Sequence, residues 1–340
     1  MNKFEKYVGI DVSSDTLDIA LFNQDQSQIV SREPFLNNMD GFESIINWLK
    51  NKGVSKENTI ICLEITGVYS EGICYYLFEQ GYSVWAEDPH KVNRAFRSQV
   101  KNDIKSAVQI AEYCFRYIDL FTPFEPNLVI VEEVKTLLTT REQLVEQKTA
   151  NKNVLGAFMR KRYKSKVAVN ALEQTLDGLE KLIKEIEKEL KNLIYNNPKY
   201  SNKAEAIDSI PGISLLFVSN FFALTNGFIE IQSAKNFASY LGICPNEYKS
   251  GTSVYKKPKS SGFGNDRLRK LLYLASMSVK QYNSKYSNYF EMKVKQGKNG
   301  ALILNNIANK LIKLVCSISK SGLPFNPLYE SIHPKFLKVI

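Results

Sequence analysis

The stretch Tyr7-Val8-Gly9-Ile10-Asp11-Val12 decides the fold predicted for the first part of the chain, because its apolar run carries a single carboxylate. Such a run is typical of a buried strand, and the alternating segment 17–22 (LDIALF) is its predicted hairpin partner across a polar turn. Further strands are predicted near 28–32 and at 59–64 and 82–87. Helices are predicted at about 40–51, 70–80 and 103–117. Three strands followed by alternating helix and strand indicate an α/β layer with a mixed sheet.

This element order is that of the RNase H-like fold, which we expect for residues 1–125. Pro123 and Pro126 then mark a break, and a helical region is predicted at about 130–195, ended by Asn197-Pro198. Its second half carries a strict heptad stripe, made of Leu172, Leu176, Leu179, Ile183, Ile186, Leu190 and Leu193. We expect this stripe to form a coiled coil with a like helix of another subunit; the alternative is an amphipathic helix packed within its own domain.

The predicted domains are therefore 1–125, an α/β metal-binding domain; 126–200, a helical and coiled-coil region; 201–325, a mostly α domain; and 326–340, a tail. The 340 residues carry a net charge of +10. Residues 251–300 hold eleven Lys or Arg against two acids, a net +9. This local excess favours a nucleic-acid partner, with an ordinary solvated basic surface as the alternative.

Other classes of protein are disfavoured by the composition. Five cysteines without a CxxC pair, mostly in apolar runs, indicate reduced core thiols of a cytoplasmic protein. Two histidines argue against a zinc site. No apolar run approaches the ~18 residues of a membrane span, and the first residues do not resemble a signal peptide. We therefore expect no membrane association.

Carboxylates at strand ends carry the chemical prediction. Asp11 and Glu64 each follow an apolar run, and burying an unpaired charge is costly. Two such groups on neighbouring strands invite a hard cation that prefers oxygen ligands, Mg²⁺ or Mn²⁺, and Asp103 at the start of a helix completes the set. Metal ions held in this way align a phosphodiester displacement. Each acid taken alone could equally be a turn residue or a helix cap.

Taken together, the motifs resemble the insertion sequence 110 family of transposases, which includes the Piv-type DNA invertases. The resemblance spans nearly the whole chain in order. It rests on Gly9-Ile10-Asp11-Val12, Glu64-Ile65-Thr66-Gly67-Val68-Tyr69, Pro89-His90-Lys91-Val92, Lys101-Asn102-Asp103, Ile210-Pro211-Gly212-Ile213, Ala238-Ser239-Tyr240-Leu241-Gly242, Ser250-Gly251-Thr252-Ser253 and Arg267-Leu268-Arg269-Lys270-Leu271-Leu272.

The resemblance implies a RuvC-like domain with four acids in the order Asp, Glu, Asp, Asp. Asp11, Glu64 and Asp103 match the first three. The fourth position, three residues further along the same helix face, is Ser106. Serine is a neutral and weaker ligand, so this departure predicts reduced metal affinity or cleavage, a water in that place, or an impaired copy.

The resemblance also implies a C-terminal domain with a serine that bonds covalently to DNA. Ser250 is the best match and Ser253 the reserve; taken locally, the segment would pass for an ordinary Ser/Gly loop. Gly251 allows close approach of DNA. The remaining predicted nucleic-acid contacts are the Pro-Gly turn and nearby cations, with a solvated helix face as the alternative for the latter: Pro211, Gly212, Lys256, Lys257, Lys259, Arg267, Arg269 and Lys270.

We therefore expect a transposase or site-specific recombinase that cleaves and rejoins donor and target DNA. The resemblance further implies a composite site shared between subunits of a dimer or tetramer, and an element-encoded noncoding RNA that guides it. The alternatives are a RuvC-like endonuclease or junction resolvase, an actin-like ATPase or sugar kinase, for which no later Gly-rich adenosine site is found, and an impaired nucleic-acid-binding homologue.

Overall fold

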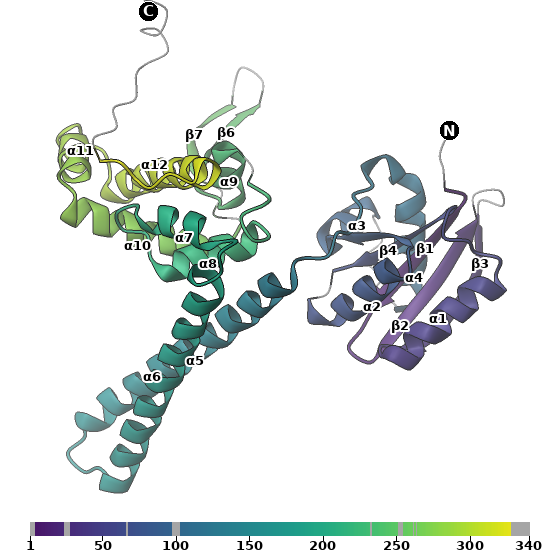
Figure 1. The fold of residues 1–340 in the computed structure, drawn as a ribbon, viewed down its shortest axis with the longest axis horizontal. Helices are drawn as coiled ribbons and strands as arrows, with labels where there is room; N and C mark the ends of the chain where they lie inside the picture. The colour runs from purple at the N-terminus through teal and green to yellow at the C-terminus, as the bar shows by residue number, and fades with distance from the viewer. Residues whose placement is uncertain are drawn as a thin grey trace, which may run out of the picture. The chain divides into compact units, whose positions relative to one another are not determined.

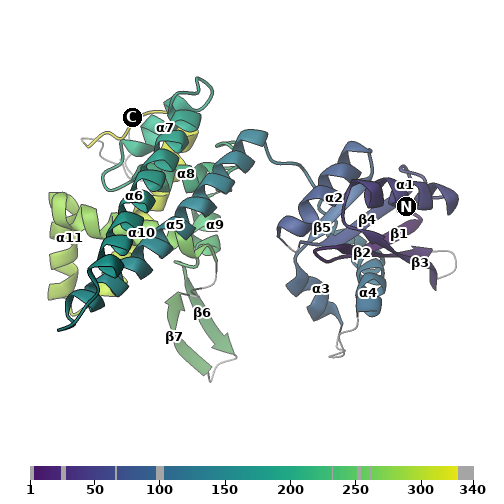
Figure 2. The same cartoon turned by 90° about the horizontal axis from the view of Figure 1, so that it is seen from below.

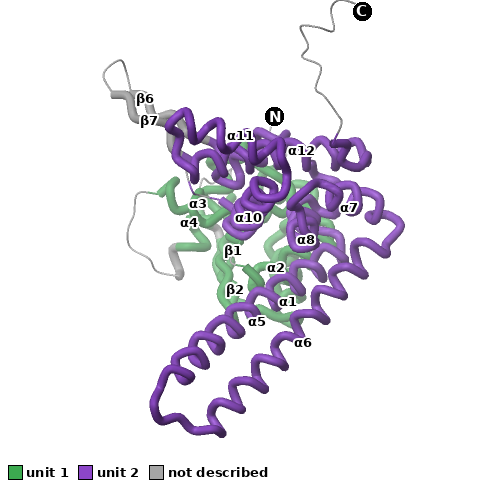
Figure 3. Tube along the Cα trace, turned by 90° about the vertical axis from the view of Figure 1, so that its left-hand side faces the viewer, with its two compact units in different colours: residues 1–126 green, residues 127–340 purple. Residues whose placement is uncertain are grey.

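The computed structural model describes residues 4–23, 28–65, 67–96, 103–231, 233–250, 254–260, 262 and 264–327. The chain divides into two compact units, Met1–Pro126 and Asn127–Ile340 (Figure 3). The boundary between the two units falls after Pro126. The second and third predicted domains form one unit, because the helical region and the C-terminal helices share a core.

The first unit is built on a five-stranded mixed sheet of order β3-β2-β1-β4-β5. The five predicted strands and three predicted helices are confirmed, and a helix at 89–95 and a 3₁₀ helix at 118–120 are present in addition. They are β1 (Lys6–Val12), β2 (Thr16–Asn23), β3 (Gln28–Leu36), α1 (Met39–Asn51), β4 (Thr59–Glu64), α2 (Val68–Glu79), β5 (Ser83–Glu87), α3 (Pro89–Ala95), α4 (Asp103–Arg116) and the short 3₁₀ helix η1 (Ile118–Leu120). Strand β1 pairs antiparallel with β2 and parallel with β4, which pairs parallel with β5.

Each face of this sheet has its own core, since successive side chains of a strand point to opposite faces. Val8, Ile10 and Leu63 pack with residues of α1 and α2. Tyr7 and Cys62 pack on the other face with residues of α4. Figure 2 shows α1 and α2 on one side of the strands and α3 and α4 on the other.

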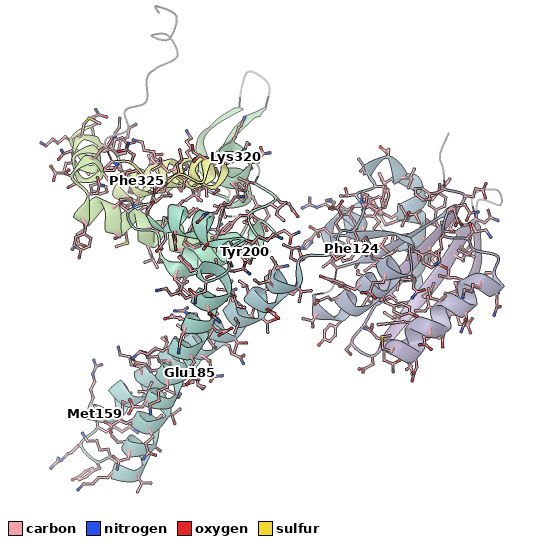
Figure 4. All side chains as sticks on the ribbon, viewed as in Figure 1. Phe124, Met159, Glu185, Tyr200, Lys320 and Phe325 are labelled. Carbon is pink, nitrogen blue, oxygen red and sulfur yellow. The ribbon has the colours of Figure 1, made fainter. Side chains whose placement is uncertain are left out.

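The second unit begins with a long helical hairpin, α5 (Val129–Met159) and α6 (Lys166–Tyr195), in which the two helices lie side by side (Figure 1). The predicted helical region is therefore two helices, and the side chain of Ser165 caps the second by accepting from the N–H of Ala168. Met159 lies at the far end of the hairpin in Figure 4.

Part of the heptad stripe packs inside the chain. Leu179, Ile183 and Leu190 are buried, and Arg141 and Lys148 of α5 form ion pairs with Glu187 and Glu180 of α6 at 2.7 and 3.1 Å. The alternative of packing within the protein's own domain therefore holds for this half of the stripe. Leu172 and Leu176, nearer the far end, are only half-buried.

The remainder is helical apart from a β-hairpin that the sequence pattern does not predict. It contains α7 (Ser201–Asp208), α8 (Leu215–Leu224), α9 (Ala234–Tyr240), β6 (Pro245–Ser250), β7 (Val254–Ser260), α10 (Asp266–Tyr282), α11 (Ser284–Lys295) and α12 (Gly300–Ser321). Helix α12 is the described helix that is long and apolar enough to cross a membrane, yet half of its apolar window is buried in the protein. Its Ile307, Leu311 and Val315 are fully buried in the helical core, which explains its apolar composition.

Candidate functional site: a carboxylate row in the α/β unit and a basic hairpin in the helical unit

Strand register places Asp11 and Glu64 side by side. Ile10 of β1 pairs with Leu63 of β4, so Asp11 and Glu64 are the next residues along two parallel neighbours. Both point to the face covered by α4, because they alternate with Ile10 and Leu63, which belong to the opposite core. Both side chains are half-buried. The predicted juxtaposition of these two acids on neighbouring strands is thus present.

Two further acids extend the row on the same face. Glu64 pairs in register with Glu87, the last residue of β5, and Asp11 pairs with Asp18 of β2. Glu87 and Asp18 escape prediction from the sequence. The signal for Glu87 is nonetheless there, because it ends an apolar strand in the same way as Glu64.

Glu87 is 5% exposed and held by three groups. The Tyr113 hydroxyl donates to its Oε2 at 3.1 Å, the Lys91 Nζ lies 2.9 Å from Oε1, and the backbone N–H of Asp88 donates to Oε1 at 2.8 Å. Burial, followed by the charge of Glu87, raises the pKa of Tyr113. Lys91, from the motif at 89–92, therefore serves to neutralise this carboxylate.

The pKa of the Cys62 thiol is affected by the same carboxylates. Its pKa is raised by burial first, then by Cys114, and also by the charges of Glu87 and Glu64. Cys62 belongs to the core beneath α4, so the two carboxylates act on a thiol on that face of the sheet. The α4 face is thus the acidic face at this end of the sheet.

Helix α4 lies directly on β1. A Cβ on Gly9 would meet the backbone of Ala107 and Ala111, which shows that only glycine allows this approach. The Tyr7 and Phe115 rings are 5.1 Å apart. The helix therefore runs antiparallel to β1, and its first residue, Asp103, lies toward the same end of the sheet as Asp11.

Ser106 is half-buried in the first turn of α4, directly before Ala107. The side chain of Asp103 lies outside the described residues. Within the described part of the chain, no three Asp, Glu, His or Cys side chains form a group that could hold a metal. The donor chemistry of Asp11 and Glu64 fits a hard cation, which would need further oxygens from groups such as Asp103, Ser106 or water.

In the helical unit, Ser250 is the last residue of β6 and pairs with Val254, the first residue of β7. Gly251 and Ser253 lie between them, outside the described residues. Lys256, Lys257 and Lys259 lie on β7, and their side chains, like that of Ser250, are also outside the described set. The predicted nucleophile and the basic stretch thus belong to the two strands of one hairpin.

The other predicted nucleic-acid contacts have structural roles as well. Arg267 forms an ion pair with Glu142 of α5. Arg269 forms one with Asp266 and donates to the carbonyl of Leu241 at 3.0 Å. Both guanidinium groups are engaged within the chain, whereas Lys270 is exposed and no ion pair is seen for it in the described region.

The Pro-Gly turn joins α7 and α8, as predicted between two helices. Gly212 has φ +82°, and a Cβ there would lie 2.7 Å from the Ala275 carbonyl oxygen of α10 and 2.9 Å from Val279 Cγ1. The glycine is therefore required by packing against α10. A phosphate contact at Pro211 and Gly212 stays a prediction.

Comparisons with known proteins match two successive stretches of the chain, the first of which includes the α/β unit and α5. Residues 8–164 match the sequence model of the IS110 DEDD transposase domain, described as "Transposase". Residues 204–291 match a second model, described as "Transposase IS116/IS110/IS902 family".

Relatives extend the likeness over most of the length. The "Pilin gene-inverting protein" of Moraxella lacunata is 22% identical over 330 residues, covering 94% of this chain and 97% of that protein. The IS110 43.6 kDa protein of Streptomyces coelicolor is 21% identical over 168 residues, covering 49% of this chain and 39% of that protein. A structure of Thermus RuvC ("T. thermophilus RuvC in complex with Holliday junction substrate") matches 35% of this chain and 99% of its own, at 12% identity and a TM-score of 0.27.

Proposed function

This chain belongs to the IS110 family of transposases, and we propose that it is a site-specific recombinase that cuts and rejoins DNA to move or invert a segment. The observation that carries the proposal is the match of residues 8–164 and 204–291, in order, to transposase sequence models. The pilin gene-inverting relative supports the rejoining chemistry, since it aligns over 94% of the chain.

We infer that Asp11, Glu64 and Asp103 would hold one or two Mg²⁺ or Mn²⁺ ions, with Ser106 as a neutral fourth ligand or the site of a bound water. The metal would supply charge stabilisation at a phosphate oxygen. The chain's own part is positioning. Register fixes Asp11 beside Glu64, and the contact at Gly9 fixes the first turn of α4 above them.

The rejoining step is assigned to Ser250, with Ser253 in reserve. The serine hydroxyl oxygen would form a bond to phosphorus, the bond from phosphorus to a deoxyribose oxygen would break, and that oxygen would take up the serine proton. The DNA strand would then be joined to the serine through a phosphodiester. This covalent linkage would keep the energy needed to rejoin the strand. Hydrolysis would release that energy. Cations on β7 would hold the DNA backbone beside the serine.

We further propose that the metal-binding unit of one subunit acts beside the serine of another, in a dimer or tetramer. Support comes from the half-buried end of the heptad stripe at Leu172 and Leu176, where a second hairpin could complete the packing. An element-encoded RNA that pairs with donor and target is carried over from the family resemblance. So is a cytoplasmic location, at the nucleoid when bound.

A second function has one observation in its favour. Ser106 leaves the metal set one carboxylate short, which favours an impaired nucleic-acid-binding homologue. A RuvC-like endonuclease or junction resolvase, which would use the same acids with Ser250 idle, is the other alternative. The two proposals differ in product. A nuclease releases ends, whereas the recombinase yields new junctions.

The experiment is a plasmid recombination assay that uses the DNA ends of the insertion sequence encoding this protein. Asp11→Asn and Glu64→Gln should each abolish new junctions, while Asp15→Asn, a matched change at an exposed turn residue near the same sheet edge, should leave them. Unchanged recombination by Asp11→Asn would overturn the assignment of the acidic face.

A further inference from the structure

Three other lysines gather around Lys310 on the surface formed by α11 and α12. Lys285, Tyr289 and Lys293 repeat every four residues along α11 and so form one stripe. The Nζ of Lys310 on α12 lies 3.6 Å from the Tyr289 ring centroid, and the Nζ of Lys293 lies 5.9 Å from it. Lys313 follows Lys310 by three residues on α12. We call these four lysines the α11–α12 lysine cluster.

The cluster concentrates positive charge that the protein does not neutralise. Lys310 has its pKa lowered by partial burial first, and then by the charges of Lys285, Lys293 and Lys313, so the other three ammonium groups lie close enough to act on that of Lys310. None of the four has an ion pair within the described part of the chain. From 266 to 327 the sequence holds only two acids, Asp266 and Glu291.

Neither acid relieves the cluster. Asp266 pairs with Arg269. Glu291 follows Tyr289 by two residues, which places it roughly 200° further around α11, beside Lys295 in a shallow hollow of about 460 Å³. A surface that keeps four mutually repelling ammonium groups together fits a polyanion, because an anion would remove the repulsion.

The aromatic ring restricts the kind of polyanion. Tyr289 is half-buried, and the Lys310 ammonium covers its ring, so the ring is not open for base stacking. The groups left to bind a polyanion are the four lysine ammonium groups, of which that of Lys310 is held over the Tyr289 ring. Lys285 and Lys293 are eight residues apart, about 12 Å along the helix, which corresponds to about three phosphates of one strand. Backbone contact without stacking is how proteins hold duplex DNA irrespective of sequence.

We propose that the α11–α12 lysine cluster is a second DNA-binding surface, which grips the phosphate backbone of duplex DNA and is formed by two helices rather than by the β6–β7 hairpin. It rests on the proposed function, because a recombinase must hold duplex flanking the site of exchange. The cluster positions DNA and contributes no reacting group.

The test is the salt dependence of binding of the full-length protein to a random-sequence DNA duplex. The double variant Lys285→Gln/Lys310→Gln should bind more weakly and make the slope of log K against log salt less steep by about 1.8, since each phosphate contact contributes about 0.9. Lys310→Arg keeps the charge and should keep the slope. Lys199→Gln is the matched control: Lys199 also lies over a tyrosine, 5.3 Å from the Tyr200 ring centroid, and is not among the charges acting on Lys310.

The outcomes separate the two proposals. A wild-type slope in the double variant overturns the cluster and leaves the recombinase assignment intact. A wild-type protein that fails to bind any duplex overturns both. A slope change seen with single-stranded RNA and missing with duplex DNA overturns the choice of DNA. A loss per removed charge in Lys199→Gln equal to that in the double variant would show only a general charge effect and would also overturn the cluster.

Discussion

Replacing Gly9 by alanine should move the helix that closes the acidic face. A Cβ at this position would lie 2.9 Å from Ala111 Cα and closer still to the Ala107 carbonyl oxygen and the Ala111 nitrogen. All three are backbone atoms, so no side-chain rotation relieves the clash and α4 must shift away from β1. Overpacking of a core costs roughly 1–3 kcal/mol, occasionally more, and a clash with backbone belongs at or above the upper end, about 3 kcal/mol.

The two tryptophans make the effect measurable in the full-length protein. Trp48 and Trp85 are the only ones and both lie in the first unit, so their fluorescence follows the unfolding of that unit. With a urea m-value of roughly 1–3 kcal/mol per molar, the midpoint should fall by at least about 1 M. Metal binding, measured by calorimetry, should weaken in parallel.

Gly72→Ala is the control in the same unit. Its Cβ would meet only the Phe42 ring, at 3.4 Å, and alanine favours the helix interior by up to about 1 kcal/mol. Its midpoint should stay or rise. A Gly9→Ala protein as stable as wild type, with normal metal affinity, would refute the claim that this contact sets the position of α4 over the carboxylates.

Three other predictions concern the metal, assembly and thiols. Ser106→Asp should tighten Mg²⁺ binding in calorimetry by restoring the fourth acid, and unchanged affinity would mean that position 106 does not face the metal. Leu172→Glu with Leu176→Glu should release monomers in sedimentation, because these half-buried residues would complete the heptad between subunits; wild-type protein that is monomeric with and without DNA would refute this. Cys244, which is half-exposed, should alkylate first at neutral pH, whereas burial raises the pKa of Cys74 to about 12 and of Cys316 to about 11. Mass spectrometry showing Cys316 modified before Cys244 would contradict that order.

Local patterns predict the first unit well. Its strands combine period-two alternation with apolar runs, and all but β3, which runs to Leu36, end within one residue of the prediction. The placement of Asp11 beside Glu64 therefore follows once β1 and β4 are known to be neighbours. The full carboxylate row does not follow from the sequence. Asp18 joins it only through the antiparallel register of β2, which places it opposite Asp11.

The second unit shows where sequence patterns fail. A heptad stripe predicts an apolar helix face but does not determine which helix packs against it. Here α5 of the same chain packs against the part of this face around Leu179. The β6–β7 hairpin is polar and lysine-rich, so it lacks the alternation that marks a strand. Arg267 and Arg269 belong to a basic run, yet Glu142, remote in sequence, and Asp266 engage them. Contacts remote in sequence, from Glu142 to Arg267 and from the Leu241 carbonyl to Arg269, set the roles of these two residues.

Mapping of covalent protein–DNA adducts tests the central claim most directly. Wild-type protein, the element's DNA ends and Mg²⁺ should give new junctions and a trapped DNA–peptide adduct at Ser250. Ser250→Ala should give neither, while binding DNA almost as tightly because every positive charge remains. Normal recombination by Ser250→Ala would contradict the account, as would wild-type protein that yields only hydrolysed ends. An adduct at Ser253 would retain the chemistry and correct the residue.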